Sequence, residues 1–184
     1  MALRLWCILA FIGMMVVITA QGSTSRNLVS SKNAENRALL LSAAHGLPGL
    51  DLDLKNVEAM TGNPAYGFKN KTIEEENVTI ANTQAALKEL ATEVESDGTL
   101  FFYFTGHGVV GGLYMGDSSI MHVSEIRKGI EDGRKGLGPV ERLILMYDSC
   151  FSGSMVDPVR RFLSDFNPEN ASQYFAASKG NYEF

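Results

Sequence analysis

The chain has 184 residues with 16 basic and 21 acidic side chains, and its formal net charge is −5 at pH 7. This charge argues against nucleic acid as the main partner, because phosphate binding requires clustered lysine and arginine side chains. An acidic balance fits a basic substrate, or indicates nothing in particular about the partner.

The first 22 residues have the pattern of a secretory signal peptide. Arg4 is followed by an unbroken apolar run over 5–18 and then by the small residues of "TAQGS". The run is shorter than the roughly 20 residues that a membrane-spanning helix needs, so we predict cleavage after Ala20 or Gly22. The mature protein is then expected to be secreted or periplasmic and free of the membrane.

Residues 23–36 are polar and rich in serine and asparagine, which predicts a flexible lead-in, and residues 37–184 form one expected domain. The chain stops soon after its last predicted strand, so we expect this domain to be incomplete at its C-terminus. After signal removal, Cys150 is the only cysteine. No intrachain disulfide can then form, and a single thiol in an exported chain is a candidate reactive group.

Four continuous apolar runs predict strands that are buried on both faces of a parallel sheet. They lie at 37–44, 99–104, 142–147 and 173–178. Helical spacing of apolar residues separates them: one helix contains Leu87, Leu90, Ala91 and Val94 behind a cap at Asn82 or Thr83, the next contains Val123, Ile126 and Ile130, and the last spans 154–163. Alternating strands and helices predict right-handed crossovers and an α/β sandwich.

Polar residues follow three of these runs, at the edge where an open parallel sheet binds its ligands. They are "HG" at 45–46, "TGHG" at 105–108 and "DSC" at 148–150. His107 and Cys150 are therefore expected at the same edge, on strands that can be neighbours.

A thiol beside an imidazole or at a helix start is favoured as thiolate, the nucleophilic form. Cys150 has His107 across the edge and the predicted 154–163 helix after it. The backbone N–H of Gly108, unobstructed by a Cβ, could form an oxyanion hole with that of Cys150.

Each of these residues also has an ordinary structural interpretation. A lone cysteine is often a small buried hydrophobe, Asp148 could cap the next turn, and Thr105 could be a strand-end hydroxyl. His45 is a rival base or a residue that shapes the rim of the site, and His122 is expected to be solvated at a helix start.

Two cofactor hypotheses are disfavoured. The stretch "GHGVVG" (106–111) matches the dinucleotide fingerprint, but that motif requires a helix to begin there, whereas the following residues predict a hairpin or loop. One cysteine and three scattered histidines lack metal-ligand spacing. We therefore expect no cofactor and no metal.

The motifs "FYFTGHG" and "LMYDSCFSG" resemble those of the caspase-like cysteine peptidases, most closely the metacaspase and bacterial caspase-homologue branch, over residues 37–178. The resemblance implies a three-layer α/β/α sandwich with a mostly parallel central sheet. It also implies that Cys150 is the nucleophile, His107 the catalytic histidine and Gly108 part of the oxyanion hole.

In metacaspases the acid two residues before the cysteine lines the substrate pocket, which would be Asp148 here, and Thr105 matches a pocket hydroxyl. A second pocket acid would be Asp51 or Asp53, with Asn56 on another register. A carboxylate pocket favours Arg or Lys in a peptide substrate.

Two alternatives stay open. "SGSM" (152–155) is also similar to legumain-like peptidases, which would favour cleavage after Asn, and a catalytically silent caspase-like domain could bind a peptide or protein in the same cleft. The acidic calcium site of many metacaspases is not recognisable, so calcium is not predicted. The sequence does not set the oligomeric state.

Overall fold

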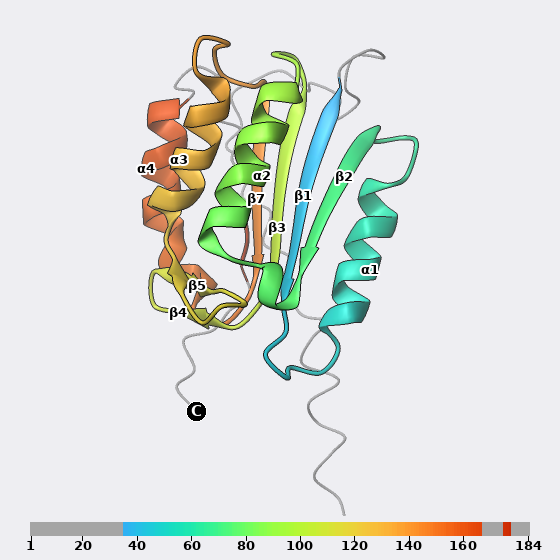
Figure 1. Ribbon diagram of the computed structural model, residues 1–184. Coiled ribbons are helices and arrows are strands. Elements are labelled where there is room, and N and C mark those ends of the chain that lie inside the picture. The colour runs from blue at the N-terminus through green and yellow to red at the C-terminus, as the bar shows by residue number, and fades with distance from the viewer. Residues whose placement is uncertain (1–34, 167–174, 178–184) are drawn as a thin grey trace, which may run out of the picture.

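The computed structural model describes residues 35–166 and 175–177. The predicted signal peptide (1–22) and nearly all of the predicted lead-in (23–36) lie outside this part of the chain and stay predictions. Strands and helices alternate along the described chain, and the long strands run side by side in one layer (Figure 1).

The central layer is a five-stranded parallel sheet in the order β2-β1-β3-β7-β8. Its strands are β1 (Asn36–Ala43), β2 (Phe68–Glu74), β3 (Thr99–Gly106), β7 (Arg142–Asp148) and β8 (Phe175–Ala177). The four strands predicted from apolar runs are all present, and β1 begins one residue earlier than expected. Every residue of β1 and β3 is buried, as expected for strands covered on both faces.

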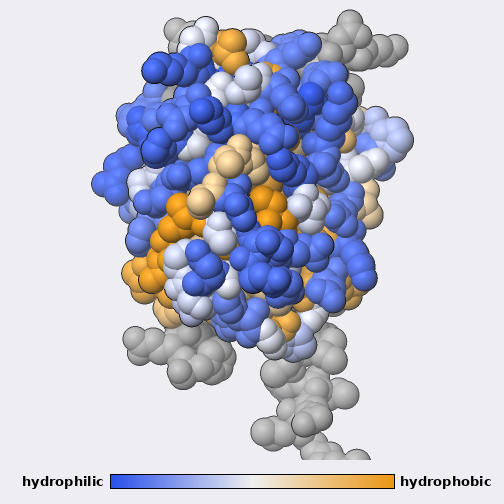
Figure 2. Space-filling view, viewed as in Figure 1, coloured by the Kyte–Doolittle hydropathy of each residue, from blue (hydrophilic) through white to orange (hydrophobic). Residues whose placement is uncertain are grey.

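Helices cover both faces of this sheet. The helix α1 (Leu50–Thr61) packs on one face, and α2 (Ile80–Glu93), α3 (Val123–Arg134) and α4 (Val156–Phe166) pack on the other. The expected three-layer α/β/α sandwich is confirmed. Figure 2 shows that the face viewed in Figure 1 is mainly hydrophilic, with a smaller apolar area near its middle. Among the described residues, no helix is long and apolar enough to span a bilayer.

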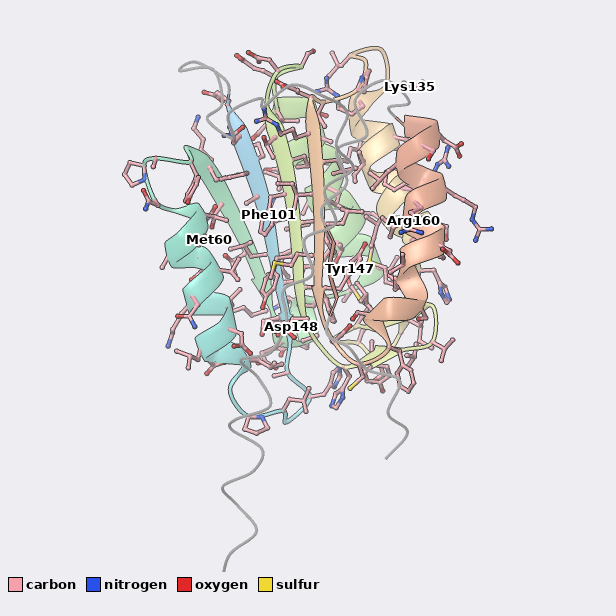
Figure 3. The ribbon with its side chains drawn as sticks, turned by 180° about the vertical axis from the view of Figure 1, so that it is seen from behind. Met60, Phe101, Lys135, Tyr147, Asp148 and Arg160 are labelled. Carbon is pink, nitrogen blue, oxygen red and sulfur yellow. The ribbon has the colours of Figure 1, made fainter. Side chains whose placement is uncertain are left out.

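The strands divide their apolar side chains between two cores, because successive residues point to opposite faces. Leu100, Phe102 and Phe104 of β3 face α2, α3 and α4 in the larger core. Phe101 and Tyr103 of the same strand face Leu54 of α1 in the smaller core, and Figure 3 shows Phe101 in the middle of the sheet.

Two elements have no counterpart among the sequence predictions. The strand β2 lies at the edge of the sheet and reads "FKNKTIE", with exposed or half-buried side chains, so it lacks a continuous apolar run. The helix α1 follows Gly49, which has a left-handed backbone and no side chain that could cap the helix. The helix α1 carries both predicted pocket acids, Asp51 and Asp53, in its first turn.

Two helix boundaries also differ from the prediction. The side chain of Thr79 caps α2 by accepting a hydrogen bond from the Asn82 N–H at 3.1 Å, so the expected cap at Asn82 or Thr83 was wrong. The predicted 154–163 helix is a 3-10 turn over Ser152–Met155 followed by α4. The α-helix therefore begins six residues after Cys150, and its N-terminus does not adjoin the thiol.

A small antiparallel sheet extends from the carboxyl end of β3. It consists of β4 (Gly108–Val109), β5 (Gly112–Tyr114) and β6 (Ile120–Met121). Of the hairpin or loop predicted after "GHG", the structure has the hairpin, and no helix begins there, so the structural context of a dinucleotide site is absent from this segment. Figure 1 shows β4 and β5 at the end of the molecule where the strands β1, β3 and β7 finish.

Candidate active site

Three neighbouring strands end at the same level. Ser42 of β1 pairs with Thr105 of β3, and Thr105 pairs with Asp148 of β7. His107 lies two residues after Thr105 and Cys150 lies two residues after Asp148. The prediction that the histidine and the cysteine emerge at one edge, from adjacent strands, is therefore confirmed.

The backbone at Gly108 lies directly against the chain of the cysteine. A Cβ on Gly108 would be 2.0 Å from the carbonyl oxygen of Cys150 and 2.8 Å from the Oγ of Ser149. Only glycine allows this approach, since any side chain would have to displace the backbone of Cys150. The His107–Gly108 pair and Cys150 thus form one compact group.

The turn after β7 presents the thiol to solvent. Cys150 is exposed and free, and Phe151 adopts a left-handed backbone with φ of 56°. The 3-10 turn that follows anchors this segment through the buried side chain of Met155. The interpretation of Cys150 as a buried hydrophobe is therefore wrong.

A ring cluster flanks His107. The ring of Tyr114, on β5, lies 4.8 Å from that of His45 and 6.4 Å from that of His107, measured between centroids. The His45 Nε2 hydrogen-bonds the Met115 carbonyl oxygen at 2.7 Å, while the two histidine rings are 6.5 Å apart. His45 therefore packs beside the candidate base, separated from it by more than hydrogen-bond distance, and braces the hairpin.

Two carboxyl groups lie on the α1 face of the sheet, beyond Tyr103 and Thr105. Burial raises the pKa of Asp148 above its usual range, and the negative charge of Asp53 on α1 raises it further. Burial also raises the pKa of Asp53. Within residues 35–166, no lysine or arginine forms an ion pair with either acid.

Tyr103 belongs to the same cluster. Burial raises the pKa of its hydroxyl, the Thr105 hydroxyl opposes the shift, and the charges of Asp148 and Asp53 add to it. Figure 3 shows Asp148 at the end of the sheet near the start of α1. This cluster of two uncompensated acids could accept a cation.

The helical phase of α1 separates the two predicted acids. Asp51 is exposed and Asp53 is half-buried, and Asp53 is the one whose charge acts on Asp148. Asn56 is exposed. Among the predicted acids, the structure thus brings Asp53 to Asp148 and leaves Asp51 outside. His122 is exposed at the start of α3, as predicted, and also hydrogen-bonds the Gly111 carbonyl oxygen through Nδ1 at 2.8 Å.

Sequence reasoning missed two residues of the site region, Ser42 and Tyr114. Ser42 interrupts the apolar run "RALLLSAA" and is buried beside Thr105, so a polar residue inside such a run was the available signal. Tyr114 is brought to His107 only because the hairpin folds back, which the spacing alone does not specify. Among the described residues, no group of three or more His, Cys, Asp or Glu side chains could hold a metal ion.

No curated protein matches the chain. The family model described as the caspase domain, a peptidase family, matches residues 35–177. This range contains every element described above, and it includes His107, Gly108 and Cys150. Because the match spans more than half of the sequence, the protein belongs to the caspase-domain family of cysteine peptidases.

Proposed function

We propose that the protein is a cysteine endopeptidase that cleaves after a basic residue, with Cys150 as nucleophile and His107 as general acid and base. The observation that carries this proposal is the contact of Gly108 with the carbonyl oxygen of Cys150, which joins the two motifs at the carboxyl edge of β3 and β7. An exposed thiol at that edge is accessible to a peptide.

In the first half of the reaction, the thiolate sulfur of Cys150 attacks the scissile carbonyl carbon. Backbone N–H groups of Gly108 and Cys150 stabilise the oxyanion that forms. Collapse of the tetrahedral species breaks the carbon–nitrogen bond, and His107 donates a proton to the departing amine. The product is a thioester between the substrate acyl group and Cys150.

In the second half, a water molecule attacks the thioester carbon and His107 accepts its proton. The carbon–sulfur bond breaks, the acid product leaves, and the thiolate and protonated imidazole are regenerated. Cys150 and His107 carry out the bond-making and proton-transfer steps of both halves of the reaction. Tyr114 and His45 limit the movement of the imidazole by packing beside it.

The acids Asp148 and Asp53 support the preference for a basic side chain. Burial raises the pKa of Asp53, and burial together with the charge of Asp53 raises the pKa of Asp148. A guanidinium or ammonium group placed between them would stabilise both ionised carboxylates. An acidic side chain would add a third negative charge, so cleavage after Asp is disfavoured. The substrate is therefore proposed to be a protein or peptide with Arg or Lys before the cut.

Export is a separate part of the proposal and rests on the signal-peptide pattern of residues 1–22. N-terminal sequencing of the protein secreted from an expressing cell tests it. A new terminus after Ala20 or Gly22 supports export, and an intact Met1 on protein retained inside the cell contradicts it.

A panel of fluorogenic peptides with Arg, Lys, Asn or Asp before the reporter tests the activity, using wild-type protein and Cys150→Ala in reducing buffer with and without calcium. We expect turnover of the Arg and Lys peptides that is lost in the variant. Turnover restricted to Asn would support the legumain-like alternative. Equal turnover by the variant would refute a role for Cys150, and no turnover by either protein would favour a silent binding domain.

A further inference from the structure

A side-chain hydroxyl, that of Ser154, joins the loop that carries Cys150 to the hairpin that follows His107. We propose that Ser154 is a positioning residue that holds these two segments in their catalytic spacing. The inference deepens the proposed peptidase function and rests on it. Ser154 Oγ accepts a hydrogen bond from the Gly111 N–H at 2.7 Å and donates one to the Phe151 carbonyl oxygen at 2.6 Å.

On one side of this link, the tip of the hairpin donates the hydrogen bond through the Gly111 N–H. Gly111 has a φ of +77°, a left-handed conformation that favours glycine. Its N–H is bound by Ser154 and its carbonyl oxygen by His122 Nδ1 at 2.8 Å. The N–H and the carbonyl oxygen of Gly111 are therefore each held by a side chain from another segment, Ser154 of the Cys150 turn and His122 at the start of α3.

On the other side of the link, the turn that positions the thiol accepts the hydrogen bond through the Phe151 carbonyl oxygen. Phe151, directly after Cys150, has the left-handed backbone that redirects the chain out of β7. Its carbonyl oxygen receives two hydrogen bonds from Ser154, one from Oγ and one from the backbone N–H at 2.8 Å. The hydroxyl thus connects Gly111 to the residue next to the nucleophile through a continuous donor–acceptor chain.

This link spans the same junction as the contact between Gly108 and Cys150. Gly108 pairs with Leu113 within the hairpin, so the position of the tip and the position of Gly108 are coupled through the β4–β5 ladder. The two segments are in close contact at Gly108, and at Ser154 they are hydrogen-bonded as well. Loss of the hydroxyl would therefore let the oxyanion-hole donor and the thiol drift apart, and catalysis is sensitive to such displacements.

The role differs from a purely structural one. Ser154 is exposed, and the turn keeps its own backbone hydrogen bond and the buried anchor Met155 when the hydroxyl is removed. The acids proposed to bind the substrate side chain lie elsewhere, on the α1 face of the sheet. Removing the hydroxyl is therefore expected to lower kcat while leaving KM and thermal stability nearly unchanged.

The test compares the full chain with Ser154→Ala, Ser154→Thr and the control Ser164→Ala. Ser154→Thr keeps the hydroxyl, and Ser164 is an exposed serine on α4 about 15 Å further along the chain. For Ser154→Ala we expect kcat on an Arg peptide to fall about three- to tenfold, the range that loss of one hydrogen bond allows. The KM should stay within about twofold, and Ser154→Thr should retain most of the activity.

Two readouts are independent of turnover: amide exchange at Gly111 by NMR, and the rate at which iodoacetamide alkylates Cys150 near pH 7. In Ser154→Ala, Gly111 exchange should speed up and alkylation should slow down by about three- to tenfold, because the hydroxyl no longer holds the tip and the thiol loses its alignment with His107. Ser164→Ala should match wild type in both.

Unchanged kcat in Ser154→Ala would overturn the proposal, as would a loss that Ser154→Thr fails to restore. A loss of activity that only follows a lower Tm would assign Ser154 a structural role and overturn it as well. If wild type shows no peptidase turnover, the proposed function fails but the positioning role is still decided: equal Cys150 alkylation rates in wild type and Ser154→Ala refute it.

Discussion

The two ends of the central sheet differ in how their polar side chains are paired. At the amino end, Asn36 donates to the Tyr66 carbonyl oxygen at 2.7 Å and accepts from the Thr99 N–H at 2.8 Å. Arg134 is buried there, and its guanidinium donates to the carbonyl oxygens of Ala91, Val94, Leu137 and Gly138. At the carboxyl end, Asp148 and Asp53 repel each other, and Cys150 is exposed.

The difference shows how buried polar groups that stabilise a fold can be told from those that are available to a ligand. Groups at the amino end are matched within the chain, so they contribute to stability. The acids at the carboxyl end keep raised pKa values, so they cost stability and remain available to a cation. Figure 3 shows both ends in one view, with Lys135, next to Arg134, far from Asp148.

The largest effect on the carboxyl end is expected from Gly108→Ala. The new methyl group would lie 2.0 Å from the Cys150 carbonyl oxygen, so the backbone of one segment must move. We expect kcat/KM on Arg peptides to fall at least about 100-fold, the scale of a lost oxyanion contact. The free energy of unfolding should fall by about 1–3 kcal/mol through overpacking.

Gly153→Ala is the matched control for this change, because a Cβ on Gly153 meets no atom within 4 Å and the residue has no positive φ. Its activity should stay within about twofold of wild type, as for surface substitutions generally. Full activity of Gly108→Ala would show that the close approach to Cys150 is not needed for catalysis.

The largest effect on the amino end is expected from Arg134→Met. The substitution leaves four carbonyl oxygens without their donor, and we expect the free energy of unfolding to fall by about 2–4 kcal/mol. Denaturant titration measures this change. Specific activity per folded molecule should be unchanged, and Arg160→Met, at an exposed position on α4, should alter stability by less than about 0.5 kcal/mol. A loss of activity without a loss of stability would contradict the distinction between the two ends.

The substitution Asp148→Asn is expected to change stability and substrate preference in opposite directions. Because the folded-state pKa of Asp148 is raised by burial and by Asp53, its ionisation lowers stability as pH rises through the folded-state pKa. The neutral variant should therefore have a higher Tm than wild type at pH 7, and the difference should shrink toward acidic pH. Activity on Arg peptides should fall about 10- to 100-fold relative to a neutral peptide.

Asp51→Asn is the control, because Asp51 is exposed on the same turn of α1 as Asp53. It should change neither the Arg preference nor the Tm, whereas Asp53→Asn should lower that preference. A lower Tm for Asp148→Asn at pH 7 would show that this carboxylate is matched by a partner.

The smallest effect is expected from His45→Gly, which keeps the left-handed backbone, φ 40°, and removes the ring. Loss of the 2.7 Å bond to the Met115 carbonyl oxygen and of the Tyr114 contact should lower kcat about two- to fivefold. Steady-state kinetics measures the effect. A fall in kcat of several hundredfold would instead identify His45 as the catalytic base and leave His107 at the rim of the site.

The apolar runs predicted β1 and β3, which are buried on both faces, and also β7, where buried and half-buried residues alternate, so its burial on both faces was overestimated. The rule that ligands bind at strand ends led to His107 and Cys150. It did not predict β2, whose edge position leaves polar side chains exposed, or α1, which lacks a side-chain cap. Without the helical phase of α1, the choice between Asp51 and Asp53 could not be made.

The contacts made by the hairpin also could not be predicted from the sequence. Tyr114 reaches His107, and Gly111 reaches Ser154, because β5 folds back beside β4. Neither contact follows from residue spacing: the hairpin turns at Gly111, and the contact with Ser154 also requires the turn at Phe151, both residues having a left-handed backbone. The 3-10 turn after Cys150 likewise replaced the expected helix start at a point where apolar periodicity alone looks helical.

The most direct test of a Cys150 peptidase with an acidic pocket is covalent labelling by peptidyl acyloxymethyl ketones that end in Arg or in Asp, measured by intact mass and peptide mapping. We predict one adduct from the Arg reagent, located on Cys150, blocked by an Arg peptide and absent in Cys150→Ala, with the Asp reagent reacting at least about 100-fold more slowly. Equal labelling by the two reagents would contradict the acidic pocket. An adduct elsewhere, or none, would contradict Cys150 as the nucleophile.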